Sequence, residues 1–313
     1  MIEPPYGEIA DLLQAGEVIP FLGAGVNFGG RPAGERWNEK TEAFLPSGAE
    51  LSQFLARQIH LPSEDEDDTN DLAKVSSYFV ETSSRRRLRD HLRKIFDREF
   101  APCAIHTYLA QVNAPMLVVT TNYDTLTEQA FQQAGRPFDL VIHPTDRKDV
   151  EASVLWWKHG DAEPVAVPPN QLFIDLKTTS VIYKMHGTVD RQLRKWDSFV
   201  ITEDDYVDFL SRMTGQTAVP ALFMRYFRTR HFLFLGYGLR DWNFRVVLKN
   251  LRAAPSAAAK SDSFDEEEEE DVRSWAIQYR PSVLETELWN ARQIRIYDVD
   301  INQFVEKLRE ESV

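Results

Sequence analysis

Residues 18–30 read VIPFLGAGVNFGG, an apolar run that ends abruptly in glycines. A strand that ends in Gly23-Ala24-Gly25 lets the main chain approach a pyrophosphate closely, with backbone N–H groups turned toward it. The spacing departs from the common dinucleotide-binding fingerprint, which requires glycine or alanine at position 28, where this chain has Phe28. The stretch therefore predicts a buried strand and a tight turn, and by itself it identifies no ligand.

Further apolar runs follow along the chain and alternate with helical patterns. Several runs are apolar throughout, which is typical of strands covered on both faces of a parallel sheet. The alternation predicts an α/β fold, a Rossmann-like parallel sheet flanked by helices. The predicted strands are 18–23, 116–122, 138–143, 181–187, 198–202, 231–238, 274–279 and 294–299, and the predicted helices include 48–59, 71–81, 83–100, 124–135 and 301–312.

The first two predicted strands are unusually far apart in the sequence. Residues 24–115 separate them and are almost wholly helical in pattern. Because a parallel crossover needs only one helix, we expect a helical subdomain over 31–115, inserted within a single catalytic domain of residues 1–313. Residues 159–173 are proline-rich and predict an irregular insertion, and residues 253–271 predict an acidic flexible loop.

The composition excludes several classes of protein. The net charge of −13 lies in two acidic stretches, since the five acids of 64–68 and the eight at 262 and 265–271 leave 36 acidic residues against 36 Lys and Arg. The rest of the chain therefore has no net charge, whereas a general nucleic-acid binder carries an excess of Lys and Arg. The single cysteine, Cys103, excludes a disulfide within the chain and a multi-cysteine zinc site. Because no apolar run is long enough to span a membrane and the N-terminal residues lack a basic leader, we expect a cytoplasmic protein.

Four of the predicted strands end in distinctive groups. The first ends in the glycine turn, the second in TTNYD (120–124), the third in KMHG (184–187) and the fourth in GYGLRDWN (236–243). In open α/β sheets, ligands bind beyond the carboxyl ends of the strands. We therefore expect these four groups to meet at one edge of the sheet.

Each of these residues also has a structural interpretation. Asp124 and Asp241 are suited to cap helices, and Asn122 is suited to a turn. An isolated histidine such as His186 is usually a satisfied core residue, although its place between an apolar strand and a glycine favours a cleft. The arginine-rich helix 85–94 is more readily explained as a solvated face than as a binding patch.

Taken in this order, GAGVN, TTNYD, KMHG and GYGLRDWN resemble the motifs of the sirtuin superfamily. More specifically, they resemble the sirtuin-like domains that hydrolyse NAD in bacterial anti-phage defence, and FVITEDDYVDF (199–209) is similar to that branch as well. The resemblance covers residues 15–250. Sirtuin deacylases carry a four-cysteine zinc module after the histidine, which a chain with one cysteine cannot form, so the resemblance is to a branch without this module.

The resemblance implies a site for NAD as substrate, without a metal, between the sheet and the helical subdomain. Asn122 and His186 are the implied catalytic residues, with His186 as the general base. The residues implied to bind the dinucleotide are Gly23, Ala24, Gly25, Asn27, Thr121, Asp124, Gly236, Tyr237, Asp241 and Asn243. The chain departs from the family pattern at Asn27, where serine is usual, and at GGRPAGERW (29–37), which leaves the roles of Arg31 and Arg36 open.

These features favour an NAD hydrolase that releases nicotinamide and ADP-ribose and acts as a cell-suicide effector in anti-phage defence. The alternatives are an NAD-dependent deacylase or ADP-ribosyltransferase, and a module that senses NAD or ADP-ribose without catalysis. A metal-dependent nuclease is a weaker alternative, based on Asp161 and the DLK of 175–177. Because an unrestrained NAD hydrolase would drain its own cell, we expect control by self-association or by a separately encoded partner. The resemblance implies a homo-oligomer and an ATPase, helicase or Argonaute-like partner. We expect neither direct nucleic-acid binding nor membrane contact.

Overall fold

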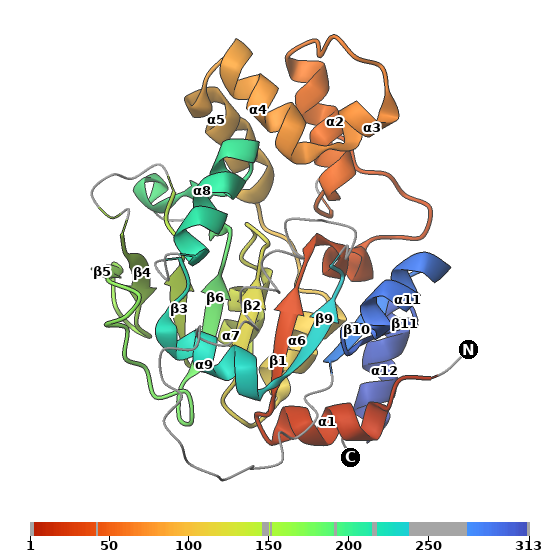
Figure 1. Ribbon diagram of the computed structural model, residues 1–313, viewed down its shortest axis with the longest axis vertical. Helices are drawn as coiled ribbons and strands as arrows, with labels where there is room; N and C mark the ends of the chain where they lie inside the picture. The colour runs from red at the N-terminus through yellow and green to blue at the C-terminus, as the bar shows by residue number, and fades with distance from the viewer. Residues whose placement is uncertain are drawn as a thin grey trace, which may run out of the picture.

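The computed structural model describes residues 3–41, 43–145, 150, 152–190, 193–214, 218–237 and 274–311. A central sheet lies between two groups of helices, and further helices lie beyond one end of the strands (Figure 1). Among the described residues, no helix is long and apolar enough to cross a membrane.

The described strands form a nine-stranded sheet in the order β11-β10-β9-β1-β2-β6-β3-β4-β5. All neighbours from β11 to β3 pair in parallel, and only the β3–β4 and β4–β5 pairs are antiparallel. The α/β fold and the parallel sheet predicted from the sequence are thereby confirmed. The strands are β1 (Val18–Leu22), β2 (Leu117–Thr120), β3 (Phe138–Ile142), β4 (Val154–Trp157), β5 (Val165–Val167), β6 (Ser180–Lys184), β9 (His231–Leu235), β10 (Ser274–Gln278) and β11 (Ile294–Asp298).

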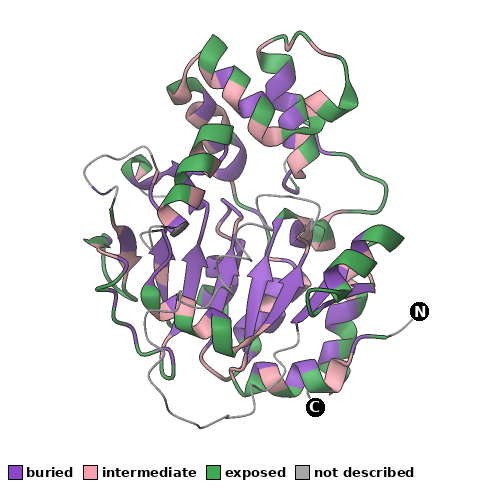
Figure 2. Cartoon of the chain, viewed as in Figure 1, coloured by how far each residue is buried: buried purple, intermediate pink, exposed green. Residues whose placement is uncertain are grey.

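Helices cover both faces of this sheet, which explains why the central strands are apolar throughout. In β1, Val18 and Leu22 pack into one hydrophobic core, whereas Ile19 and Phe21 pack into another on the opposite face. The first core includes α1 (Tyr6–Gln14), α6 (Ala104–Gln111), α7 (Leu126–Gln133) and α12 (Ile301–Glu311), and the second includes α8 (Glu203–Thr214), α9 (Ala221–Thr229) and α11 (Val283–Asn290). The central strands are accordingly buried along most of their length (Figure 2).

Four helices between β1 and β2 form what we term the helical layer, beyond the carboxyl ends of the strands. These are α2 (Gly48–Gln58), α3 (Glu66–Asn70), α4 (Leu72–Thr82) and α5 (Arg85–Phe96) (Figure 1). They share a hydrophobic core of their own, which includes Leu55, Phe79 and Leu92 and continues onto Tyr123 and Phe199 at the sheet edge. Whether residues 31–115 form a separate subdomain stays a prediction, and α6 of this range packs on the sheet.

Some local predictions differ from the structure. The segment 159–173 is not irregular throughout, since β5 lies within it and forms a hairpin with β4 at the exposed sheet edge. The predicted strand 198–202 is reduced to β8 (Ser198–Phe199), which pairs with β7 (Gly187–Thr188) in a separate two-stranded sheet. The predicted acidic loop 253–271 lies outside the described residues.

Candidate active site

A cavity of about 450 Å³ opens where the carboxyl ends of β1, β2, β6 and β9 meet the helical layer. It brings together most of the site residues predicted from the sequence, although these come from four separate segments of the chain. The predicted residues that line it are Ala24, Gly25, Asn27, Thr121, Asn122, Asp124, His186, Gly236 and Tyr237. Gly23 precedes the lining residue Ala24 and does not itself line the cavity, and Asp241 and Asn243 lie outside the described residues.

The glycines of the first turn allow β1 and β9 to approach each other closely. A Cβ atom on Gly25 would lie 2.6 Å from the Gly236 carbonyl oxygen, and one on Gly23 would lie 2.7 Å from the same oxygen. The N–H groups of Gly23 and Gly25 already donate to Leu235 and Gly236, at 3.0 and 2.8 Å. The turn thus has a packing role in addition to its predicted one, and its contact with a pyrophosphate stays a prediction.

Asn122 is fixed at the end of β2 by two hydrogen bonds. Its side-chain Nδ2 donates to the Gly23 carbonyl oxygen at 3.2 Å, and its backbone N–H donates to Thr120 Oγ1 at 3.0 Å. The amide oxygen receives no hydrogen bond from the described residues. Asn122 therefore presents a fixed, uncharged acceptor to the cavity.

Asp124 belongs to a buried polar cluster beneath the cavity. Its Oδ2 accepts from Asn27 Nδ2 at 3.0 Å, and its Oδ1 accepts from the N–H of Leu126 at 3.1 Å in the first turn of α7. The buried Lys184 donates to the Asp124 carbonyl oxygen and lies 3.1 Å from the Glu128 carboxylate. Asp124 thus stabilises the start of α7 from the position before the N-cap, which is Thr125 and not Asp124 as predicted, and it also lines the cavity.

His186 lies against an aromatic wall formed by α8. Its imidazole contacts Tyr206 and Phe209 edge to face, with ring centroids 5.3 and 5.6 Å apart. Burial lowers the pKa of His186 to about 4, and the nearby carboxylate of Asp205 opposes this effect. The imidazole is therefore neutral at pH 7, as a general base must be.

A second cavity of about 800 Å³ adjoins the first and shares Gly25, Phe28, Gly236 and Tyr237 with it. It extends past the carboxyl ends of β10 and β11 to the start of α12. Arg31 lines this second cavity and binds the Glu50 carboxylate through both terminal nitrogens, at 2.9 and 2.8 Å. Arg31 therefore joins the first turn to α2, whereas Arg36 is exposed.

The structure does not support the nuclease alternative. Asp161 lies on an exposed loop and lines a separate cavity of about 890 Å³, to which no predicted site residue contributes. The Asp175 carboxylate accepts hydrogen bonds from its own turn, from Lys177 N at 3.1 Å and Thr178 Oγ1 at 3.0 Å. In the described ranges, no group of three or more His, Cys, Asp or Glu is arranged to hold a metal ion.

Several lining residues were missed because they have no local signal of function. They come from the helical layer, from the two residues before α2 and from α8: Pro46, Ser47, Gly48, Leu51, Leu72, Phe96 and Tyr206. Tyr206 follows the TEDD of 202–205, and the family resemblance of residues 199–209 is the sequence signal that could have identified it.

Comparisons with known proteins show which proteins the chain is similar to. Residues 116–297 match the family described as "SIR2-like domain". The chain is 21% identical over 305 residues to "Defense-associated sirtuin 2" of Bacillus subtilis, which covers 95% of this chain and 25% of that protein. It is 27% identical over 212 residues to "NAD(+) hydrolase ThsA" of Acinetobacter baumannii (strain 532279), which covers 65% of this chain and 35% of the relative. The protein of the same name from Bacillus cereus (strain MSX-D12) is 26% identical over 211 residues, with 66% and 37% covered. The chain thus spans between 25% and 37% of the length of these relatives.

Proposed function

The chain belongs to the SIR2-like domain family, whose match covers more than half of its length, and from this premise we propose that it is an NAD⁺ hydrolase. The proposed reaction adds water across the bond between nicotinamide and ribose and yields nicotinamide, ADP-ribose and a proton. The observation that carries the proposal is that Asn122 and His186 line one cavity at the carboxyl ends of the parallel strands. The relatives named NAD(+) hydrolase support the same reaction.

The two adjoining cavities suit the two halves of a dinucleotide. In this proposal the nicotinamide riboside half occupies the cavity that contains Asn122 and His186, and the adenosine half occupies the cavity beyond β10 and β11. The pyrophosphate then lies at Gly25 and Gly236, which both cavities share. Asp241 and Asn243 remain predicted to line the adenosine side.

The chemistry of the lining residues suits cleavage of a cationic leaving group. The bond to nicotinamide breaks through an oxocarbenium-like state, as in glycoside hydrolysis, and water then adds to the ribose carbon. The neutral imidazole of His186 accepts the proton that this water or a ribose hydroxyl gives up, which contributes about 10²- to 10⁴-fold. The amide oxygen of Asn122 orients the water or hydroxyl, and the buried Asp124 carboxylate stabilises the developing positive charge.

The biological role that we propose is depletion of NAD⁺ as a cell-suicide effector in anti-phage defence. The relative named "Defense-associated sirtuin 2" supports this role. Such an enzyme requires an inactive state, so we propose that it forms a homo-oligomer and that a separately encoded ATPase, helicase or Argonaute-like partner controls it.

Turnover of NAD⁺ in ¹⁸O-labelled water tests the reaction. Purified protein is incubated with NAD⁺, the products are separated, and their masses are measured by mass spectrometry. We expect unlabelled nicotinamide and ADP-ribose that carries one ¹⁸O atom. Transfer of ADP-ribose to an acylated peptide or to protein would instead identify a deacylase or transferase, and binding of NAD⁺ without nicotinamide release would identify a sensor.

A further inference from the structure

Three arginines of α5 form a stripe along one side of the helix, at the spacing that places residues on one face. Arg85 donates to the Asp205 carboxylate at 2.7 Å and to the Phe199 carbonyl oxygen at 2.7 Å. Arg89 donates to the Asp197 carbonyl oxygen at 3.1 Å, and Arg93 donates to the Asp197 carboxylate at 2.9 Å. The stripe therefore joins the helical layer to residues 197–205, and this face of α5 is not a solvated surface.

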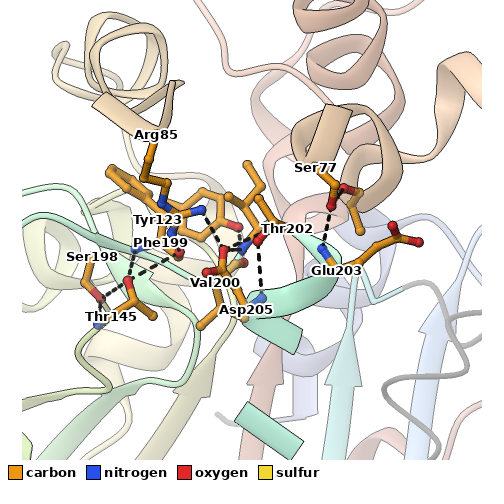
Figure 3. A network of polar contacts seen from close by, with 12 residues as sticks. Ser77, Arg85, Tyr123, Thr145, Ser198, Phe199, Val200, Thr202, Glu203 and Asp205 are labelled. Carbon is orange, nitrogen blue, oxygen red and sulfur yellow. Dashed lines mark hydrogen bonds and ion pairs between the residues drawn. The ribbon is translucent and has the colours of Figure 1, made fainter. Parts of the chain in front are cut away.

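Asp205 connects Arg85 to the start of α8. The same carboxylate oxygen, Oδ2, accepts from Arg85 Nη1 and from the backbone N–H groups of Ile201 and Thr202, the latter two at 2.9 Å (Figure 3). In return, Thr202 Oγ1 accepts from the N–H of Asp205 at 3.2 Å. This reciprocal pair is a capping box, and it fixes where α8 begins. On α4, Ser77 Oγ accepts from the N–H of Glu203 at 2.9 Å, which adds a second link to the helical layer.

The segment held in this way contacts His186 on two sides. The N–H of Val200 donates to the His186 carbonyl oxygen at 2.9 Å, and the Val200 carbonyl oxygen accepts from Tyr123 Oη at 2.6 Å. From α8, the rings of Tyr206 and Phe209 contact the imidazole. A shift of this segment would therefore move both the backbone and the ring of His186.

We propose that Arg85 and Asp205 are positioning residues for the general base: their ion pair fixes α8 and residues 199–205 so that the His186 imidazole is held in the cavity. This inference rests on the proposed function. Both side chains are largely buried, with 21% and 16% of their surface exposed, so solvent screens the pair only weakly. Because a misplacement of about 1 Å can cost about 100-fold in rate, a residue outside the cavity can control turnover.

The charge of Asp205 provides a second readout, because it acts on His186 through space. Among the described residues, the titratable groups that line the cavity with His186 or interact with it are Asp124 and Tyr123 in the β2–α7 loop, Asp205 and Tyr206 on α8, and His143 after β3. Of these, Asp205 raises the pKa of His186 against the effect of burial. Its neutralisation should therefore lower that pKa further and shift the acid limb of activity to lower pH.

The test compares Arg85→Ala, Asp205→Asn and the double variant with wild type, and uses Arg86→Ala as a matched control. Arg86 is exposed on the same helix and has no hydrogen bond or ion pair with any described residue. We expect Arg85→Ala to lower kcat for nicotinamide release about 10- to 100-fold while KM for NAD⁺ changes less than about twofold. The double variant should be no slower than the slower single variant, because the two side chains act as one unit. Arg86→Ala should retain wild-type kcat.

Two outcomes would overturn the inference: equal kcat in Arg85→Ala and Arg86→Ala, or losses that multiply in the double variant. If Arg85→Ala does not fold, Arg85→Lys keeps the charge and takes its place, with a smaller loss of kcat expected. A wild-type protein without nicotinamide release would refute the proposed function instead. In that case the His186 ring is titrated by NMR, with His186→Ala to assign its signal. A lower midpoint in Asp205→Asn than in wild type would support the inference, and an unchanged midpoint would contradict it.

Discussion

His186 is the residue on which the proposed chemistry depends most. Burial against Tyr206 and Phe209 lowers its pKa to about 4, whereas the same side chain in water titrates near pH 6.5. Burial thus keeps the imidazole neutral over a wide pH range, but it also makes the imidazole a weaker base.

This shift predicts the pH dependence of activity. Because the proposed base works only when it is unprotonated, kcat/KM should stay level from pH 8 to about pH 5.5 and fall below that, with a midpoint near the pKa of about 4. The pH dependence of kcat/KM is measured from initial rates in buffers of constant ionic strength. Circular dichroism at each pH is the control for unfolding. A fall with a midpoint near pH 6.5 in folded protein would contradict a buried base.

Single residues also show what the sequence could and could not predict about the site. Asn122, Asp124 and His186 could be predicted to lie together because each comes within four residues of the end of an apolar strand, and parallel strands end at one edge of a sheet. Ser47 and Phe96 were not found, because they line the cavity only through the packing of α2 and α5 above the sheet. No local pattern encodes such packing.

Helices and strands, too, could be predicted only where their pattern is local in the sequence. The central strands were predicted because each is a continuous apolar run, as burial on both faces requires. The β4–β5 hairpin was missed because its strands are short and lie at the sheet edge, where β5 is largely exposed. The sequence favours a solvated face for the helix 85–94, because the partners of Arg85, Arg89 and Arg93 lie about 100 residues further along the chain and leave no local signal.

The junction of β1 and β9 supplies a prediction at this scale. Gly25→Ala should lower the free energy of unfolding by about 1–3 kcal/mol, because the added methyl group would lie 2.6 Å from the Gly236 carbonyl oxygen and force the two strand ends apart. Gly7→Ala is the matched control, since its Cβ atom would lie 3.4 Å from the end of the flexible Glu311 side chain. Urea denaturation measures both variants. Equal stability of Gly25→Ala and wild type would show that the close approach of the two strand ends does not require glycine at position 25.

At the scale of the whole molecule, the proposed control by assembly can be measured directly. We expect the purified chain to form a homo-oligomer with low basal turnover of NAD⁺, because an unrestrained hydrolase would drain the cofactor of its own cell. Light scattering after size-exclusion chromatography, over a range of protein concentrations, gives the mass, and a nicotinamide-release assay on the same fractions gives the activity. A monomer with full turnover that is harmless to the cells expressing it would contradict this proposal.

In the proposed function, Asn122 and His186 together perform the chemistry of one NAD⁺-cleaving site. The most direct test is the rate of nicotinamide release by His186→Ala and Asn122→Ala, with His159→Ala as the control because His159 is exposed and lines a different cavity. With melting temperatures close to that of wild type, both site variants should lose at least about 100-fold in kcat, whereas His159→Ala should match wild type. Near wild-type turnover in a folded His186→Ala or Asn122→Ala variant would contradict the claim.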